Sequence, residues 1–312
     1  MLSIVFPGQG SQFVGMGKDI LDSYPEVKIF YDEVDDALNQ KLSNIIFNGP
    51  EEELILTENA QPAIMVVGIA IIKILSKRGF EVNNLFKFSA GHSLGEYTSL
   101  AALNSLSLSD TAKLLKIRGK SMQSSFPKDK GSMAAILGLK RDEVEEALLE
   151  KKNESICQIA NDNAPGQVVI SGEIHCVEEV IELLNAKGAK KVVKLPVSAP
   201  FHSDLMQKAK DVMSEEINNT FFEEPLVPII QNVSVEPTKE TEVIKKNLID
   251  QVTGTVRWRE TMLKFVELNV SCIVEVGAGT VLTNLTKRNS PNLKRITLNS
   301  KENIENFMKE HE

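Results

Sequence analysis

The sequence predicts an α/β fold in which a small ferredoxin-like subdomain interrupts a larger one. Strand and helix patterns alternate in both outer parts of the chain, which is typical of an α/β fold. Between them, residues 126–198 follow the order strand, helix, strand, strand, helix, strand, the βαββαβ order of a ferredoxin-like unit. We therefore expect residues 1–125 and 199–312 to form the large subdomain and residues 126–198 the small one.

Strands in the first part of the chain lead directly into glycine-containing loops. Residues 2–6, LSIVF, are rich in β-branched side chains and end at a Pro-Gly pair, which predicts a buried strand followed by a loop. Residues 85–90 predict the next strand, and the segment from Gly91 predicts a sharp turn into a helix with apolar residues at helical spacing. The nearly continuous apolar run over 61–77 predicts a buried helix, because it is long for a strand. Its uninterrupted part, 62–72, falls short of the roughly 20 residues that span a bilayer.

The remaining elements follow the same two hydrophobic periods. We predict further strands at 132–139, 155–161, 167–171, 191–197, 227–232 and 272–276, and further helices at 141–151, at 176–186 and from 281 onward. The elements after residue 199 are expected to join the first part of the chain in one sheet.

Composition and charge exclude several classes of protein. The chain has 312 residues, 42% of them hydrophobic and 25% charged, which is ordinary for a soluble globular protein. The net charge of -8 argues against a general nucleic-acid binder. Three widely spaced cysteines, Cys157, Cys176 and Cys272, form no CxxC pair, so neither a disulfide framework nor a zinc site is expected. The N-terminus lacks the basic region of a signal peptide, so we expect a cytoplasmic protein that binds no membrane.

Three glycine segments resemble nucleotide-binding motifs, but none is complete. Gly8-x-Gly10 and Gly277-x-Gly279 each follow a predicted strand and lack the third glycine. Gly119-Lys120-Ser121 lacks the upstream glycine of a phosphate loop, since Leu114 stands there. We therefore expect no nucleotide cofactor.

The most informative motif is Gly91-His92-Ser93-Leu94-Gly95, a GxSxG where a strand turns into a helix. Flanking glycines allow a strained elbow that raises the Ser93 hydroxyl above the sheet and leaves the following backbone N–H free to bind an oxyanion. The start of the helix adds partial positive charge. The motif in this context predicts that Ser93 is a nucleophile.

A serine hydroxyl needs a base, and the chain has only four histidines. His311 lies in the C-terminal tail, and His175 lies in a polar turn that enters a helix. His92 adjoins the serine on the elbow, where neighbouring side chains point apart. His202 follows Pro200 in a loop that returns toward the main sheet, so we favour His202 as the general base.

Together these residues carry a resemblance that covers nearly the whole chain. The segments that carry it are FPGQGSQ at the N-terminus, NAQPA from Asn59, GHSLGE from Gly91, the helix with Arg118, Asn161-x-Asn163, PFH ending at His202, and VRW from Val256. The chain resembles the acyltransferase family that includes the malonyl-CoA:acyl carrier protein transacylases of type II fatty acid synthesis and the acyltransferase domains of polyketide synthases.

The resemblance implies an α/β-hydrolase-like large subdomain and assigns roles in the site. Ser93 is acylated, and His202 is its base. The backbone carbonyl of Gln251 orients the imidazole in place of an acid, although the sequence alone leaves Asp204 open as an orienting acid. The backbone N–H groups of Gln9 and Leu94 form the oxyanion hole.

The resemblance also identifies residues that recognise the substrate. Arg118 holds the free carboxylate of the malonyl group, and a guanidinium suits that task because it donates two parallel hydrogen bonds. The lysine-rich helix around Arg118 would by itself favour an exposed arginine. Phe201, beside His202, disfavours a 2-methyl branch on the acyl group. Asn161 belongs to the NxN segment and is placed at the substrate.

The implied reaction transfers malonyl from malonyl-CoA to the phosphopantetheine thiol of acyl carrier protein in two half-reactions, without a metal or redox cofactor. Because acyl carrier proteins are acidic, we predict docking at a basic patch of Lys190, Lys191, Lys287 and Arg288. We expect a monomer. Two alternatives stay open: a serine esterase or thioesterase that accepts water, and a non-catalytic module that only docks a carrier protein.

Overall fold

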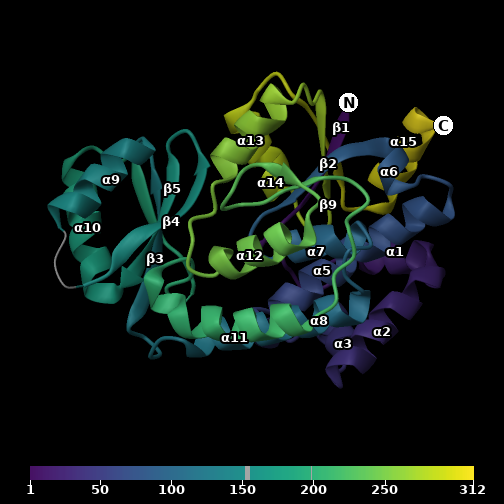
Figure 1. Cartoon of the computed structure of the whole chain (residues 1–312), viewed down its shortest axis with the longest axis horizontal. Coiled ribbons are helices and arrows are strands. Elements are labelled where there is room, and N and C mark those ends of the chain that lie inside the picture. The colour runs from purple at the N-terminus through teal and green to yellow at the C-terminus, as the bar shows by residue number, and fades with distance from the viewer. Residues whose placement is uncertain (152–154, 198) are drawn as a thin grey trace.

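Two separate sheets organise the chain, as Figure 1 shows. The computed structural model describes residues 1–151, 155–197 and 199–312. The larger sheet contains β1 (Leu2–Phe6), β2 (Phe86–Gly91), β7 (Ile229–Ile230), β8 (Pro237–Thr238), β9 (Cys272–Val276) and β10 (Lys294–Leu298). The smaller sheet contains β3 (Gly131–Leu137), β4 (Cys157–Ala164), β5 (Gln167–Glu173) and β6 (Lys191–Lys194).

The larger sheet has the order β10-β9-β1-β2-β7-β8 and is parallel except for β8. β1 lies between β9 and β2, and its residues Ile4, Val5 and Phe6 are fully buried because both faces of the sheet are covered. The carboxyl ends of parallel strands meet at one edge, so the loops after β1, β2, β7 and β9 converge there.

Helices of the large subdomain surround this sheet (Figure 1). They are α1 (Lys18–Ser23), α2 (Lys28–Leu38), α3 (Leu42–Asn48), α4 (Glu51–Leu54), α5 (Thr57–Lys77), α6 (Val82–Leu85), α7 (Gly95–Ala102), α8 (Leu108–Ser124), α11 (Gln207–Asn219), α12 (Thr241–Gln251), α13 (Trp258–Glu267), α14 (Val281–Asn289) and α15 (Lys301–His311). By length and composition α5 could cross a membrane, but its apolar window is 89% buried inside the protein, as in a core helix.

The smaller sheet confirms the predicted ferredoxin-like unit. The chain runs β3, α9 (Arg141–Glu150), β4, β5, α10 (Ile174–Ala186), β6, and the antiparallel sheet has the order β4-β5-β3-β6. The apolar faces of both helices pack on the sheet through Val144, Val177 and Val180. The predicted subdomain boundary after residue 198 falls on a residue outside the described ranges.

Several elements differ from the sequence-based prediction. The strand predicted at 227–232 is shorter in the structure and consists only of β7, Ile229–Ile230. The side chains of Gln231 and Asn232, which follow it, hydrogen-bond to Glu96 and to the carbonyl of Gly91. The strand predicted at 191–197 ends at Lys194, close to Pro196, which has no N–H for a ladder. The elements that were not predicted are β10 and the helices α1, α2, α3, α4, α6, α11, α12, α13 and α15.

The two sheets are joined next to the converging loops. In β4, the N–H of Asp162 donates to the carbonyl of Val256 at 2.9 Å, and the N–H of Val256 donates to the carbonyl of Ala160 at 2.8 Å. The buried carboxylate of Asp162 also pairs with Arg259 of α13, at 2.9 Å. These contacts fix one end of β4 against the large subdomain.

Candidate active site

The predicted elbow stands between β2 and α7, where Ser93 has the left-handed φ of 53°. Its glycines are required by close backbone contacts. A Cβ on Gly91 would lie 1.9 Å from the carbonyl carbon of Gly95, and a Cβ on Gly95 would lie 2.2 Å from the carbonyl oxygen of Phe6. Gly91 therefore lets the chain fold back on the start of α7, and Gly95 lets the elbow pack directly on the end of β1.

The structure brings Ser93 and His202 together. Ser93 Oγ lies 2.8 Å from His202 Nε2, and His202 Nδ1 lies 2.9 Å from the backbone carbonyl oxygen of Gln251. His202 is only 5% exposed and also has a left-handed φ, 56°. Asp204 hydrogen-bonds to Gln158 instead. A neutral carbonyl therefore occupies the place that an acid holds in a Ser-His-Asp triad.

The environment of His202 keeps its imidazole neutral. Burial, followed by the positive charge of Arg118, lowers the pKa of His202 to about 3. With its Nδ1–H donated to the Gln251 carbonyl, the free lone pair on Nε2 faces Ser93 Oγ. His202 is therefore unprotonated at neutral pH, which a general base must be before it can accept the serine proton.

The other three histidines have partners of their own. His92 Nε2 lies 2.8 Å from Asn163 Oδ1, so His92 links the elbow to β4. His175 on α10 lies 2.8 Å from Ser155 Oγ. His311 on α15 hydrogen-bonds to the carbonyl of Phe307. Their placement agrees with the choice of His202 by elimination.

Arg118 is buried beside the nucleophile. Only 1% of it is exposed, although the lysine-rich helix α8 by itself favoured an exposed side chain. Arg118 Nη1 donates to Gln61 Oε1 at 2.8 Å, and Nη2 donates to Gln251 Oε1 at 2.8 Å and to Ser93 Oγ at 3.0 Å. No ion pair within the described residues joins this guanidinium to a carboxylate. The buried Glu96 acts on Arg118 electrostatically, but burial raises the pKa of Glu96 to about 8, so this carboxyl is largely protonated at neutral pH and the guanidinium still attracts an anion.

Gln9 and Leu94, whose backbone amides were predicted to bind the oxyanion, both line the cavity that contains Ser93. Within the described residues, no backbone hydrogen bond from the N–H of Gln9 or Leu94 is recorded. The loop after β1 reaches the elbow because Gly8 has no side chain; a Cβ there would lie 2.7 Å from the carbonyl oxygen of His92. Leu94 stands directly before α7, so the partial positive charge of the helix start adds to its N–H, and the oxyanion hole of Gln9 and Leu94 stays a prediction.

A cavity of about 260 Å³ opens above these groups. Ser93, His202 and Arg118 line it, and so do the predicted residues Gln9, Leu94, Phe201 and Asn161. Sequence reasoning missed its apolar wall, which consists of Ile55, Met122, Met133, Leu195 and Val197. These come from four separate segments, and no local pattern distinguishes them from core residues.

Sequence reasoning also missed the polar groups that hold the site from within. Gln61 and the side chain of Gln251 both accept from Arg118. Gln251 Nε2 also donates to the backbone carbonyl of Ser93 at 3.0 Å. Glu96, in the first turn of α7, is fully buried and accepts a hydrogen bond from the backbone N–H of Asn232. Burial raises the pKa of Glu96 to about 8. The sequence offered one signal for such residues, which is a polar side chain within a stretch that is predicted to be buried.

Three of the four residues of the basic patch meet at one end of the small sheet, and Lys287 precedes Arg288 on α14. Leu137 pairs with Gln167 on one side and with Lys191 on the other. Arg288 of α14 donates to Gln167 Oε1, and the backbone N–H of Lys190 donates to the carbonyl of Leu137. All four side chains of the patch are exposed, and no ion pair of the described residues includes them.

The nucleotide-like glycines serve packing. A Cβ on Gly119 would lie 2.6 Å from Glu58 Cα, so this glycine lets α8 approach α5. Gly277, with φ of 132°, packs beside Pro7 of the loop after β1. The three cysteines are free thiols. Among the described residues, no group of three His, Cys, Asp or Glu side chains is placed to hold a metal ion.

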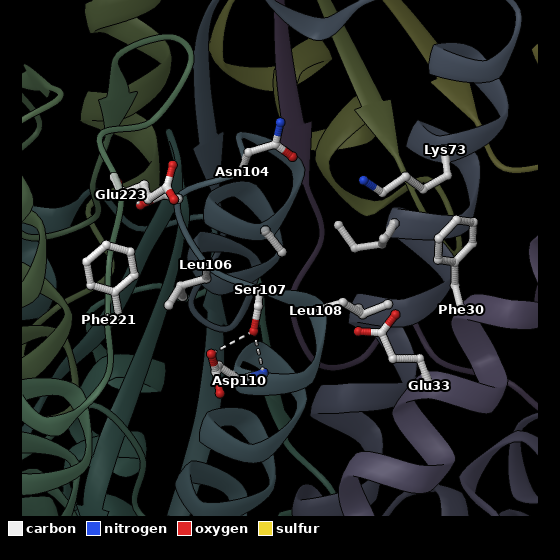
Figure 2. A pocket seen from close by; sticks show the side chains of 13 residues that line it. Phe30, Glu33, Lys73, Asn104, Leu106, Ser107, Leu108, Asp110, Phe221 and Glu223 are labelled. Atoms are coloured by element: carbon white, nitrogen blue, oxygen red, sulfur yellow. Dashed lines mark hydrogen bonds between the residues drawn. The ribbon is translucent and has the colours of Figure 1, made fainter.

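A second cavity, of about 370 Å³, lies away from this site (Figure 2). Phe30 and Phe221 stand at its two sides, and Ser107 hydrogen-bonds to Asp110 between them. Its described lining residues include serines but no histidine that could activate one.

Comparison with known proteins agrees with this geometry. A model of the family described as the acyl transferase domain matches residues 4–308. The malonyl CoA-acyl carrier protein transacylase of Bacillus subtilis (strain 168) is 40% identical over 307 residues, which cover 97% of this chain and 95% of that protein. The protein of the same name from Escherichia coli (strain K12) is 37% identical over 286 residues, or 92% of each chain.

Solved structures share the whole architecture. An acyl-carrier-protein-S-malonyltransferase from Bartonella henselae superimposes with a TM-score of 0.97 at 47% identity, covering 99% of this chain and 98% of that one. A malonyl-transacylase solved in complex with its type II PKS acyl carrier protein superimposes with a TM-score of 0.96 at 35% identity, covering 99% of both chains.

Proposed function

The chain belongs to the malonyl CoA-acyl carrier protein transacylases of the acyltransferase family, and we propose that it transfers malonyl from malonyl-CoA to the phosphopantetheine thiol of acyl carrier protein through a malonyl-Ser93 intermediate. The product, malonyl-acyl carrier protein, serves as a substrate of fatty acid biosynthesis. No cofactor takes part in this reaction.

The observation that carries the proposal is the buried guanidinium of Arg118, 3.0 Å from the nucleophilic oxygen. Malonyl differs from acetyl by one carboxylate. That carboxylate supplies the anion that Arg118 lacks among the described residues, and it can accept two parallel hydrogen bonds from one guanidinium. The cavity thus distinguishes an acidic acyl group from a neutral one.

In the first half-reaction, Ser93 Oγ attacks the thioester carbonyl of malonyl-CoA while His202 Nε2 takes the serine proton. The backbone N–H groups of Gln9 and Leu94 stabilise the oxyanion. The C–S bond breaks, and coenzyme A leaves with the proton from His202. Gln251 keeps the imidazole oriented throughout, because its carbonyl holds Nδ1–H.

In the second half-reaction, His202 takes the proton from the phosphopantetheine thiol, and the sulfur attacks the malonyl ester. The bond between the malonyl carbonyl carbon and Ser93 Oγ breaks, and His202 returns the proton to Ser93 Oγ. We propose that acyl carrier protein docks at the basic patch of Lys190, Lys191, Lys287 and Arg288, and that Phe201 and Asn161 contact the acyl group and its thioester arm.

Intact-mass spectrometry tests the proposal. After mixing with malonyl-CoA, we expect one added malonyl group, which disappears when holo-acyl carrier protein is added and never forms on Ser93→Ala. A protein that gains no adduct is not a transacylase of this kind. An adduct that water removes as fast as the carrier protein does identifies a thioesterase instead.

A further inference from the structure

One buried side chain outside the catalytic motifs holds the peptide units around Ser93. Asn232 follows β7 and is fully buried. Its Oδ1 accepts a hydrogen bond from the N–H of Ser93 at 2.8 Å, and its Nδ2 donates to the carbonyl oxygen of Gly91 at 2.7 Å. Both ends of the amide are therefore used on the elbow.

The orientation of this amide is fixed by its surroundings. Oδ1 also faces Gln251 Nε2, at 3.4 Å, whereas Nδ2 faces a carbonyl, so the two ends cannot be exchanged without loss of hydrogen bonds. The backbone of Asn232 is anchored as well, because its N–H donates to Glu96 and its carbonyl accepts from the N–H of Arg257. Asn232 is a rigid support.

The elbow needs such a support. Ser93 has a left-handed backbone, which non-glycine residues keep only where the surrounding structure holds it. Its N–H precedes α7, so no helical carbonyl is available to pair with it. A rotation of this peptide would move Ser93 Oγ away from His202 Nε2 and would turn the adjoining N–H of Leu94 away from the cavity.

We propose that Asn232 is a positioning residue for the nucleophile. It acts through the backbone of Ser93 and does not line the cavity, so it sets the rate of attack and leaves substrate affinity unchanged. The role holds for whichever acyl group Ser93 accepts; only its measurement with malonyl-CoA rests on the proposed function.

The test compares Asn232→Leu with Asn232→Asp. Leucine has a similar size and removes both hydrogen bonds, whereas aspartate retains the oxygen that faces the N–H of Ser93. A fluorophosphonate reports the nucleophile directly: Ser93 Oγ bonds to phosphorus, fluoride leaves and His202 takes the proton. We expect Asn232→Leu to lower both the labelling rate and the maximal rate of malonyl transfer by about 100-fold, while KM for malonyl-CoA stays nearly unchanged. Asn232→Asp should recover part of the loss in both rates.

Asn247 provides a matched control from the same buried polar cluster. Its Nδ2 donates to Gln231 Oε1 at 3.0 Å, and it does not contact Ser93. Asn247→Leu should lose stability, yet its labelling rate should stay near that of the unchanged protein. Equal losses of labelling rate in the two leucine variants, or normal labelling of Asn232→Leu, would overturn the proposal.

If Asn232→Leu does not fold, Asn232→Asp and Asn247→Asp give the same comparison, with a slower labelling rate expected only for Asn232→Asp. An unchanged protein that reacts with the fluorophosphonate but not with malonyl-CoA would contradict the proposed function. The comparison of the Asn232 and Asn247 variants would remain decisive in that case.

Discussion

Arg118 shows how one residue determines which acyl group the cavity accepts. Its guanidinium is buried, its described hydrogen-bond partners are the neutral groups Gln61, Gln251 and Ser93, and it lies 5.7 Å from the ring centre of Tyr97. A charge-assisted hydrogen bond contributes about 1.5 to 3 kcal/mol. Recognition of one carboxylate can therefore account for strong discrimination between malonyl and acetyl.

Arg118→Ala should lower malonyl transfer roughly 10- to 150-fold while acetyl transfer changes little, because acetyl has no carboxylate to lose. Rates of transfer from malonyl-CoA and acetyl-CoA, measured side by side, check this. The alanine variant should also hydrolyse its acyl-enzyme faster, since water can enter the vacated space. If both transfers fall by the same factor, the carboxylate is recognised elsewhere.

His202 gives a prediction about pH. Its pKa is lowered to about 3, so it stays neutral and able to accept a proton well below the ordinary histidine pKa of about 6.5. The acylation rate of Ser93 by malonyl-CoA should therefore show no decrease centred near pH 6.5 as the pH is lowered from 7.5 to 5. Mass spectrometry of samples quenched at set times measures the acylation rate at each pH. A tenfold decline of this rate centred near pH 6.5 would contradict the lowered pKa of His202.

The same shift has a consequence for stability. In the folded protein His202 takes up no proton until the pH approaches 3, whereas the unfolded chain takes one up below about 6.5. The unfolded state thus binds more protons between these values, and the contribution of His202 to stability decreases as the pH falls through this range.

At the scale of elements, the site depends on the close contact of the loop after β1 with the elbow. Gly95 begins α7 directly against the carbonyl oxygen of Phe6. The parallel neighbours β1 and β2 therefore fix the distance between Gln9 and Leu94, the two candidate oxyanion donors. A side chain at Gly95 would therefore push the loop after β1 away from the elbow.

Gly95→Ala should destabilise the fold by about 1–3 kcal/mol and greatly slow acylation of Ser93, because its Cβ meets backbone that cannot yield cheaply. Thermal unfolding and adduct formation measure the two effects. Gly79→Ala is the control: Gly79 has a φ of 87° but no atom within 4 Å of its Cβ position. This variant should lose roughly 1–2 kcal/mol and keep its acylation rate. Normal acylation by Gly95→Ala would show that the loop contact does not set the site.

At the scale of the whole molecule, the net charge of -8 makes the placement of basic residues important for an acidic partner. Neighbouring lysines on the small subdomain are neutralised, since Lys194 pairs with Glu178 at 2.7 Å and Lys187 pairs with Glu150 at 2.5 Å. Among the described residues, none of the four residues of the basic patch forms such an ion pair. It also combines both subdomains, because two of its residues lie at β6 and two lie on α14.

Reversal of charge in the variant Lys190→Glu with Lys287→Glu should raise KM for acyl carrier protein roughly 3- to 30-fold and leave acylation by malonyl-CoA intact. Lys194→Glu, which changes a lysine that is already paired, should have a much smaller effect. Steady-state rates at varied carrier-protein concentration, together with the adduct assay, separate the two half-reactions. An unchanged KM for carrier protein would place docking elsewhere, and equal damage to both half-reactions would indicate misfolding.

The sequence by itself determined the parts of this protein that depend on neighbouring residues. The strands Leu2–Phe6 and Cys272–Val276, the βαββαβ order and the GxSxG elbow at Ser93 follow from hydrophobic period and glycine placement. Elimination among four histidines pointed to His202 because the alternatives were few.

Only the tertiary structure decided which distant residues meet. Local spacing favoured an exposed Arg118, and burial followed only when α8 packed on α5 at Gly119. Asn232 and the side chain of Gln251 gained their partners through hydrogen bonds to Ser93, 139 and 158 residues earlier in the chain. Hydrogen bonds and buried charges depend on atoms brought together by the sheet, and a one-dimensional pattern carries no record of such long-range contacts.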